Sequence, residues 1–306
     1  MFTRKFDNGF LIQLKNSSLF KDKLLPDIKN GDVFPAIRNE RIDFYYKGGK
    51  LFSFSGDRKF TTNMKYAIVP SFEYKTNDSE EKSYVTEDDL RLRKSLFLID
   101  DFSKNYEKIK TNCELYSQYS EALGVSFLYE YSFIKEEKNI VLLDTEISFE
   151  NIKEHKKKDR IDILLYSRKG RELKFIEAKL YSNKELRAKK DKENKYPEII
   201  DQIIRYNEQI KVRKDEILGA YNDYSVIMNE LFDTKLDNPK GILPTTGLYI
   251  FGFDDDQKNT GLKRILENIN NGINVIKEKK LDRIISYCKG DPLSIKINAL
   301  WDGVCR

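Results

Sequence analysis

Residues 160–180 read RIDILLYSRKGRELKFIEAKL, the clearest structural pattern in the chain. Two apolar runs, 160–166 and 173–180, flank a short polar segment that contains Gly170. Apolar runs of this length on either side of a glycine-containing polar turn are typical of a β-hairpin. We therefore expect two antiparallel strands here.

The turn sets the pairing between these two strands. With Lys169 and Gly170 at its centre, counting outward places Asp162 directly opposite Glu177, with Cβ atoms roughly 5 Å apart. Side chains alternate along a strand, so Glu177 and Lys179 face the same way. The sequence predicts two carboxylates and an amine on one patch of an apolar hairpin.

Such a patch suits the hydrolysis of phosphodiesters. Like charges opposed across strands are destabilising, and a bound divalent cation removes the conflict. Carboxylate oxygens favour Mg²⁺, with Mn²⁺ as the alternative. The metal can polarise a phosphate and activate water, while the Lys179 ammonium stabilises developing charge. The competing interpretation is a surface salt bridge on a solvated strand face, since the acidic-x-Lys spacing recurs, for example at Glu136 and Lys138.

At these residues the chain resembles the PD-(D/E)xK nuclease superfamily, whose core motif matches Asp162 and Glu177-Ala178-Lys179. Gln202 and Tyr206, four residues apart and hence on one helix face, look like the Gln-x-x-x-Tyr signature of one branch of that superfamily. Taken alone, the second pair also fits a surface glutamine beside a half-buried tyrosine. The resemblance covers residues from about 106 to 253, with Ile161 where many members have proline.

The resemblance implies an α/β fold: a restriction-endonuclease-like core in which helices flank a mixed central sheet, preceded by a small β-rich N-terminal module. It implies a catalytic set of Asp162, Glu177, Lys179, Gln202 and Tyr206. It implies metal ligands at Glu121, Asp162, Glu177 and Ala178. Glu121 is chosen as the carboxylate of the first core helix, and Glu114 and Glu130 compete with it.

The chain divides into residues 1–88, a β-rich module for recognition or partner binding, and residues 89–306, the nuclease domain. Expected strands lie at 33–38, 41–46, 51–54, 65–69, 139–143, 160–166, 173–180 and 247–253. Expected helices lie at 89–103, 106–133, 198–220 and 262–280, and the best linker lies at 75–89. The module's aromatic residues can stack on bases or form the core of a small sheet, and we favour the core: Phe34, Phe44, Tyr45, Tyr46, Phe52 and Phe54.

Several other classes of protein are disfavoured. The chain has one histidine, His155, in a Lys-rich segment, which argues against zinc sites with two imidazoles and against a Ser-His-Asp mechanism. Three cysteines far apart in the sequence do not make a disulfide framework. No GxxxxGK[ST] phosphate loop occurs. No apolar run approaches the roughly 20 residues that span a bilayer, and we expect a cytoplasmic protein with no membrane partner.

A basic segment supplies the expected nucleic-acid contact. Residues 151–195 carry 16 Lys and Arg against 8 Asp and Glu, in a chain of net charge +5. Lysines and arginines near the hairpin are expected to hold the phosphate backbone: Lys184, Arg187, Lys189, Lys190 and Lys192. A solvated loop is the alternative.

We therefore expect a Mg²⁺-dependent nuclease that cuts DNA, with a part in bacterial phage defence or restriction that rests on the resemblance alone. An RNA-cutting enzyme on the same core, and a non-catalytic nucleic-acid-binding protein that keeps the fold, are the alternatives. The N-terminal module is expected to recognise a target or a partner protein, and homo-oligomerisation stays open.

Overall fold

The computed structural model describes residues 2–68, 84–93, 98–117, 120–149, 159–188, 196–275 and 283–303. The chain forms two compact units, which are named here by their sheets. The six-stranded unit comprises residues 1–2, 135–222 and 237–306, and the five-stranded unit comprises residues 3–134 and 223–236. This grouping differs from the expected boundary at residue 88, because helix α5 (Tyr106–Ser117) packs on the first sheet.

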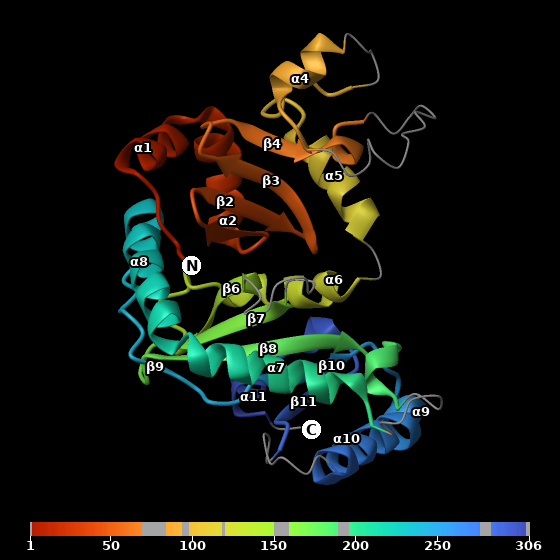
Figure 1. Ribbon diagram of the computed structural model, residues 1–306. Helices are drawn as coiled ribbons and strands as arrows, with labels where there is room; N and C mark the ends of the chain where they lie inside the picture. Colours follow the sequence, from red (N-terminus) through yellow and green to blue (C-terminus); the bar gives the residue numbers. More distant parts are fainter. Residues whose placement is uncertain are drawn as a thin grey trace. The chain divides into compact units, whose positions relative to one another are not determined.

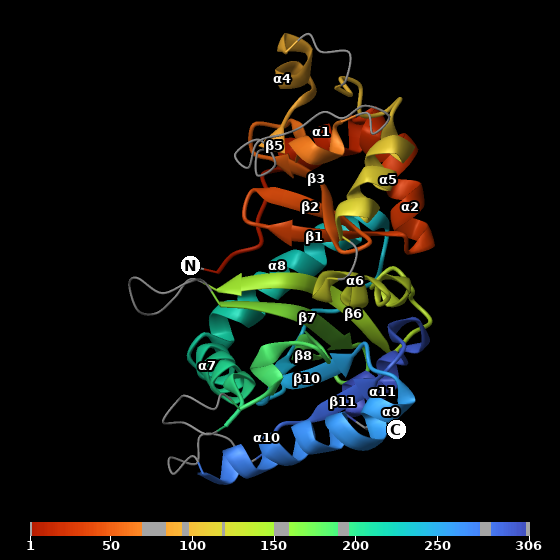
Figure 2. The ribbon, with the colours of Figure 1, turned by 90° about the vertical axis from the view of Figure 1, so that its right-hand side faces the viewer.

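The six-stranded unit is built on a mixed sheet (Figures 1 and 2). The strand order is β11-β10-β8-β7-β6, and β9 pairs with β8. The bounds are β6 (Ile140–Phe149), β7 (Asp159–Ser167), β8 (Glu172–Leu180), β9 (Gly241–Ile242), β10 (Gly247–Phe251) and β11 (Ser286–Lys289). Strands β6, β7 and β8 run antiparallel, whereas β8, β10 and β11 run parallel. Strand β8 thus lies inside the sheet, with its Glu172–Ile176 part paired to β7 on one edge and its other edge paired to β9 and β10.

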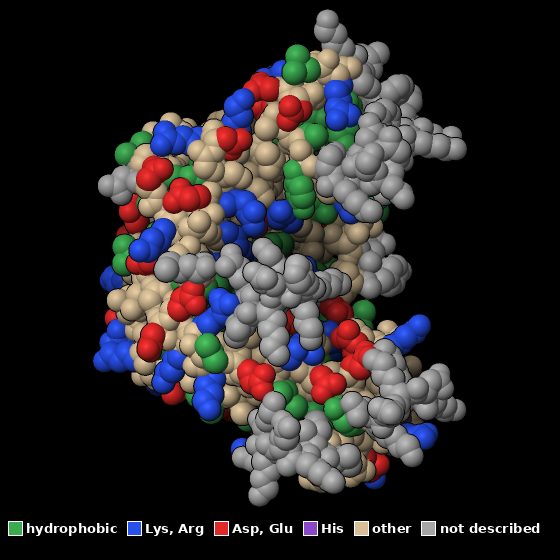
Figure 3. Space-filling model, in the orientation of Figure 1, with side chains coloured by type: hydrophobic (Ala, Val, Ile, Leu, Met, Phe, Trp, Pro, Cys, Tyr) green, Lys and Arg blue, Asp and Glu red, His purple; other side chains and the backbone are tan. Residues whose placement is uncertain are grey.

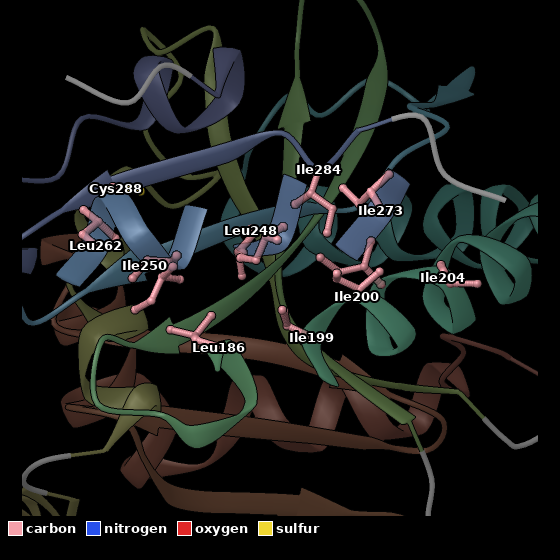
Figure 4. Packing of buried hydrophobic residues seen from close by; sticks show 13 residues of the cluster. Leu186, Ile199, Ile200, Ile204, Leu248, Ile250, Leu262, Ile273, Ile284 and Cys288 are labelled. Atoms are coloured by element: carbon pink, nitrogen blue, oxygen red, sulfur yellow. The ribbon is translucent and has the colours of Figure 1, made fainter. Parts of the chain in front are cut away.

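Helices cover this sheet through continuous apolar stripes. Helix α7 (Glu198–Val212) buries Ile199, Ile200 and Ile203, a spacing that keeps side chains on one helix face. These residues pack with Leu248 and Ile250 of β10 in one apolar cluster. Figure 4 shows the cluster, to which α10 (Lys263–Val275) also contributes. Further described helices of this unit are α9 (Asp255–Gln257) and α11 (Ile297–Asp302), and α8 (Lys214–Phe232) begins in this unit and ends in the other.

The five-stranded unit contains an antiparallel sheet in the order β1-β2-β3-β4-β5. Its strands are β1 (Val33–Arg38), β2 (Arg41–Tyr46), β3 (Gly49–Ser55), β4 (Phe60–Asn63) and β5 (Tyr84–Val85). Its helices include α1 (Asn8–Asn16), α2 (Leu25–Asn30), α4 (Glu87–Leu92) and α6 (Glu121–Ser126). Phe34, Phe44, Phe52 and Phe54 are buried, as favoured from the sequence, whereas Tyr45 and Tyr46 are half-buried.

The expected fold class is confirmed: the chain is mixed α/β, with an antiparallel N-terminal sheet and a mixed sheet flanked by helices. The strand expected at 65–69 is wrong, because the Asn63 side chain accepts from the Lys65 N–H and starts a 3-10 turn at Met64–Tyr66. The helix expected at 198–220 is two helices, since α7 ends at Val212 and α8 begins at Lys214. Most of the expected linker lies outside the described residues.

In the described part of the chain, no helix has the length and apolarity needed to cross a membrane.

Replacing Ile203 with alanine tests the packing of α7. Ile203 is fully buried in the apolar cluster, so Ile203→Ala should lower the free energy of unfolding by about 2–5 kcal/mol. The measurement is urea unfolding followed by circular dichroism. Val212→Ala, at a site 72% exposed at the end of the same helix, is the control and should stay within about 0.5 kcal/mol of wild type. Equal losses in both variants would contradict this packing.

Candidate active site

The β7–β8 hairpin has the pairing that the turn predicts. Ser167 pairs with Glu172, and the ladder continues in register to Ile163 and Ile176. Beyond this pair the two strands separate. There the Ala178 N–H of β8 is bonded to the Asp162 side chain instead of to a backbone carbonyl of β7. Asp162 Oδ2 accepts from the Ala178 N–H at 2.9 Å. Asp162 is therefore fixed beside the point where Glu177 and Lys179 emerge from β8.

Lys179 lies between two carboxylates. Its Nζ is 2.8 Å from Glu177 Oε1 and 2.7 Å from Glu185 Oε2. The Glu177 and Lys179 side chains are almost fully buried, whereas that of Glu185 is 42% exposed. The short distance from Lys179 to Glu177 confirms that the two side chains share one face of β8. Glu185 was not expected; it lies on the short 3-10 turn Lys184–Leu186 that follows the hairpin.

Helix α7 joins this group through Gln202 and Tyr206. Gln202 Nε2 donates to Glu177 Oε1 at 2.9 Å and to the Tyr206 hydroxyl at 2.7 Å. The Tyr206 hydroxyl in turn donates to the Arg160 carbonyl of β7 at 2.6 Å. One helix face is thereby bonded to both strands of the hairpin. Glu177 Oε1 receives both the Lys179 ammonium and the Gln202 amide, so its orientation is fixed from two sides.

Burial dominates the electrostatics of Asp162. Desolvation raises the pKa of this carboxyl well above its ordinary value, and the neighbouring charges of Glu177 and Glu146 raise it further. The Ala178 N–H and the Lys179 ammonium oppose the rise. Like-charge repulsion, which the sequence suggests as the main conflict, is therefore the second cause of the raised pKa rather than the first.

Glu146 is a third carboxylate, and no motif in the sequence marks it. It lies between Thr145 and Ile147, whose partners on β7 are Ile163 and Ile161, so it stands opposite Asp162. Its backbone has φ of 55°, a left-handed conformation that non-glycine residues rarely adopt and that costs on the order of 1–3 kcal/mol. Its Oε2 is 2.7 Å from Arg160 Nη1. Strained residues of this kind cluster at functional sites.

The donor set suits a hard cation. Asp162 and Glu177 offer carboxylate oxygens, and the Gln202 Oε1 is a buried oxygen without a hydrogen-bond partner in the described structure. Hard oxygen ligands of this kind are those that magnesium and manganese prefer. Within the described ranges, however, no three or more His, Cys, Asp or Glu side chains are grouped as a ready-made metal site. Ala178, an expected ligand residue, can offer a cation only its backbone carbonyl oxygen, and its N–H donates to Asp162.

The remaining expected residues lie on other elements of the chain. Glu121 begins helix α6, and with its competitors Glu114 and Glu130 it belongs to the five-stranded unit. Lys184 is exposed at the start of the 3-10 turn. Arg187 Nη1 donates to the carbonyls of Tyr181 and Asn183 at 2.8 and 2.9 Å, which commits this group to the turn. Other expected residues lie outside the described ranges: Lys189, Lys190 and Lys192.

Comparison with known proteins adds no assignment. No family model matches the chain, and searches of curated proteins and of solved structures give no significant match. The functional interpretation therefore rests on the residues of this chain.

Replacing Asp162 with asparagine tests the burial of its charge. Asparagine keeps an oxygen for the Ala178 N–H and carries no charge. Because the folded-state pKa is raised, burial of the Asp162 carboxyl destabilises the metal-free fold as pH rises; this penalty is absent below the ordinary pKa of an aspartate, grows between that value and the folded-state pKa, and is complete above it. Asp162→Asn should therefore raise the melting temperature in EDTA at neutral pH, by about 2–4 °C for every kcal/mol of charge-burial penalty that the substitution removes.

The same comparison at pH 4 supplies the control, because there the difference between wild type and Asp162→Asn should shrink. Mg²⁺ should stabilise wild type and leave the variant unchanged. A variant that is less stable than wild type at neutral pH in EDTA would contradict the raised pKa.

Proposed function

We propose that this chain is a metal-dependent nuclease of the PD-(D/E)xK type, which hydrolyses phosphodiester bonds in DNA. The observation that carries the proposal is the buried group of Asp162, Glu177 and Lys179, in which Glu177 contacts Lys179 and accepts from Gln202, and Asp162 accepts from the Ala178 N–H. A bound Mg²⁺, with Mn²⁺ as the alternative, supplies Lewis-acid polarisation of the phosphate and lowers the pKa of water. Asp162 and Glu177 would hold it.

Burial of these charges argues against a purely structural salt bridge. Asp162, Glu177 and Lys179 are exposed by 9, 2 and 5% respectively. Taking charges out of water costs several kcal/mol for each ion, and apolar side chains of similar size commonly stabilise a fold at least as well. Buried titratable groups with strongly shifted pKa values are more frequent at functional sites. Their presence here supports a chemical role.

Each side chain has a distinct task in the proposed reaction. Lys179, close to Glu177 at the end of β8, presents an ammonium that can stabilise negative charge developing on the phosphate oxygens. Gln202 orients Glu177, and the Ala178 N–H orients Asp162. Tyr206 holds helix α7 against the hairpin through the Arg160 carbonyl. Because these contacts are already formed, little rearrangement is needed at the moment of reaction.

Cleavage of supercoiled plasmid tests the proposal. Wild type should nick or cut the plasmid with Mg²⁺ or Mn²⁺ and be inactive in EDTA. Lys179→Ala should lower the cleavage rate by about 100-fold or more, because one stabilising charge is lost from the transition state. The matched control is Lys169→Ala, which removes an exposed lysine from the turn of the same hairpin. Thermal unfolding shows whether both variants are folded.

The outcomes separate the alternatives. Cutting that survives in Lys179→Ala would show that the proposed site is wrong. A wild-type protein that cuts RNA and leaves DNA intact under the same conditions would contradict the assignment of the substrate. Metal-independent cutting would contradict the assigned chemistry.

A further inference from the structure

A second group of charged residues lies on the sheet of the five-stranded unit. Asp43 of β2 is 1% exposed, and it accepts a hydrogen bond from Ser53 Oγ at 2.6 Å. Arg41 Nε is 3.0 Å from Asp43 Oδ1, so one buried carboxylate already has a hydroxyl donor and a cation. A buried carboxylate is stable when it is hydrogen-bonded and paired with a cation, and these two contacts supply both interactions.

Two further cations face the same carboxylate. Arg38 Nε and Lys50 Nζ are each 4.0 Å from Asp43. The four side chains thus hold three positive charges against one negative charge. Arg41 and Asp43 alternate on β2 and so share a face, and Arg38 pairs with Arg41 across the strands. Figure 3 shows Lys and Arg side chains gathered on this part of the molecule. Arg41 and Lys50, which lie against the same carboxylate, repel one another, and an external anion relieves the repulsion.

An exposed aromatic ring adjoins these cations. Tyr84 of β5 is 47% exposed, and the Lys50 ammonium lies 4.1 Å from its ring centroid. Surfaces that bind single-stranded nucleic acid combine basic residues along the backbone with aromatic rings on which bases stack. Arg41 is 43% exposed, so it can reach a ligand while it stays close to Asp43.

We infer that this face of the sheet binds a single-stranded segment of nucleic acid, with Arg41 and Lys50 on the phosphates and Tyr84 beneath a base; Arg38, whose side chain is 11% exposed and whose Nη1 donates to the Ile37 carbonyl, lies behind them. Asp43 positions the cations and does not contact the ligand. The inference deepens the proposed function, because it gives the nuclease a second surface for DNA. It does not depend on cleavage, because binding needs neither the metal nor the hairpin site.

Binding of a labelled 20-nucleotide single strand to full-length Asp162→Asn protein in EDTA tests the inference, since no cleavage can interfere. Arg41→Gln combined with Lys50→Gln should weaken binding about tenfold or more at low salt. It should also reduce the slope of log affinity against log salt by about 1.4, as two phosphate contacts are lost. The matched control is Lys15→Gln combined with Lys59→Gln, which removes two exposed cations from the same unit, each paired with one carboxylate. The control should bind almost as wild type does.

Tyr84 and Lys50 supply the second arm. Tyr84→Ala should weaken binding by about five- to a hundredfold, whereas Tyr84→Phe keeps the stacking surface and should retain it. The double variant Lys50→Gln with Tyr84→Ala keeps the pair of Arg41 and Asp43. It should also bind more weakly than wild type, and it replaces the first double variant if that one does not fold.

Three outcomes would overturn the inference. Equal losses in the double variant and its control would mean that net charge alone drives binding. No loss in the double variant would mean that DNA binds elsewhere. A poly-glutamate peptide that displaces the strand as well as unlabelled DNA does, together with full binding by Tyr84→Ala, would indicate a surface for acidic protein instead. If single-stranded DNA binds through this surface but the wild-type protein with Mg²⁺ does not cleave DNA, the proposed nuclease function is refuted and the binding surface stands.

Discussion

The hydrogen bond from the Ala178 N–H to Asp162 is the contact on which the candidate site depends. Strands β7 and β8 separate after Ile163 and Ile176, and this carboxylate satisfies the donor that the departing strand leaves behind. The same bond holds Asp162 in the interior, beside Glu177, where its pKa is raised by burial and by its neighbours. This one hydrogen bond thus connects the two strands where their backbones separate, fixes the orientation of the Asp162 carboxylate, and holds it close to the like charge of Glu177. A fold selected only for stability would replace such charges with apolar groups.

The surrounding elements stabilise this arrangement. Strand β8 is paired on both sides, and α7 packs its isoleucines into the apolar cluster with β10. Helix α7 makes polar contacts and apolar contacts with different side chains. Gln202 and Tyr206 are bonded to the hairpin, while Ile199 and Ile203 are buried in the apolar cluster. Lys179 has carboxylates on two sides, one buried and one partly exposed. Because Glu185 comes from a turn outside the sheet, the position of the ammonium depends on the segment that follows the hairpin.

Local spacing explains which features the sequence could predict. The turn at Gly170 and strict alternation set the register of the hairpin, and a spacing of four residues places Gln202 and Tyr206 together. Features that depend on distant contacts were missed. Glu146 lies on a strand that extends beyond its apolar run to Phe149 and has a left-handed residue within it. Residues 89–134 group with the first sheet because α5 packs on β3, which no local pattern indicates. Nothing in the spacing of Arg38, Arg41, Asp43 and Lys50 indicates that three cations meet one carboxylate.

A carbon-13 NMR titration of the aspartate carboxyl groups, with the Asp162 resonance assigned through Asp162→Asn, tests the central claim most directly. In metal-free protein the Asp162 carboxyl should titrate well above the ordinary range of aspartates, because burial and neighbouring carboxylates disfavour its charge. Saturating Mg²⁺ should lower that pKa, since a bound cation favours the ionised carboxylate. An ordinary pKa in metal-free protein, unchanged by Mg²⁺, would contradict the claim that this buried pair of carboxylates is built to hold a metal ion.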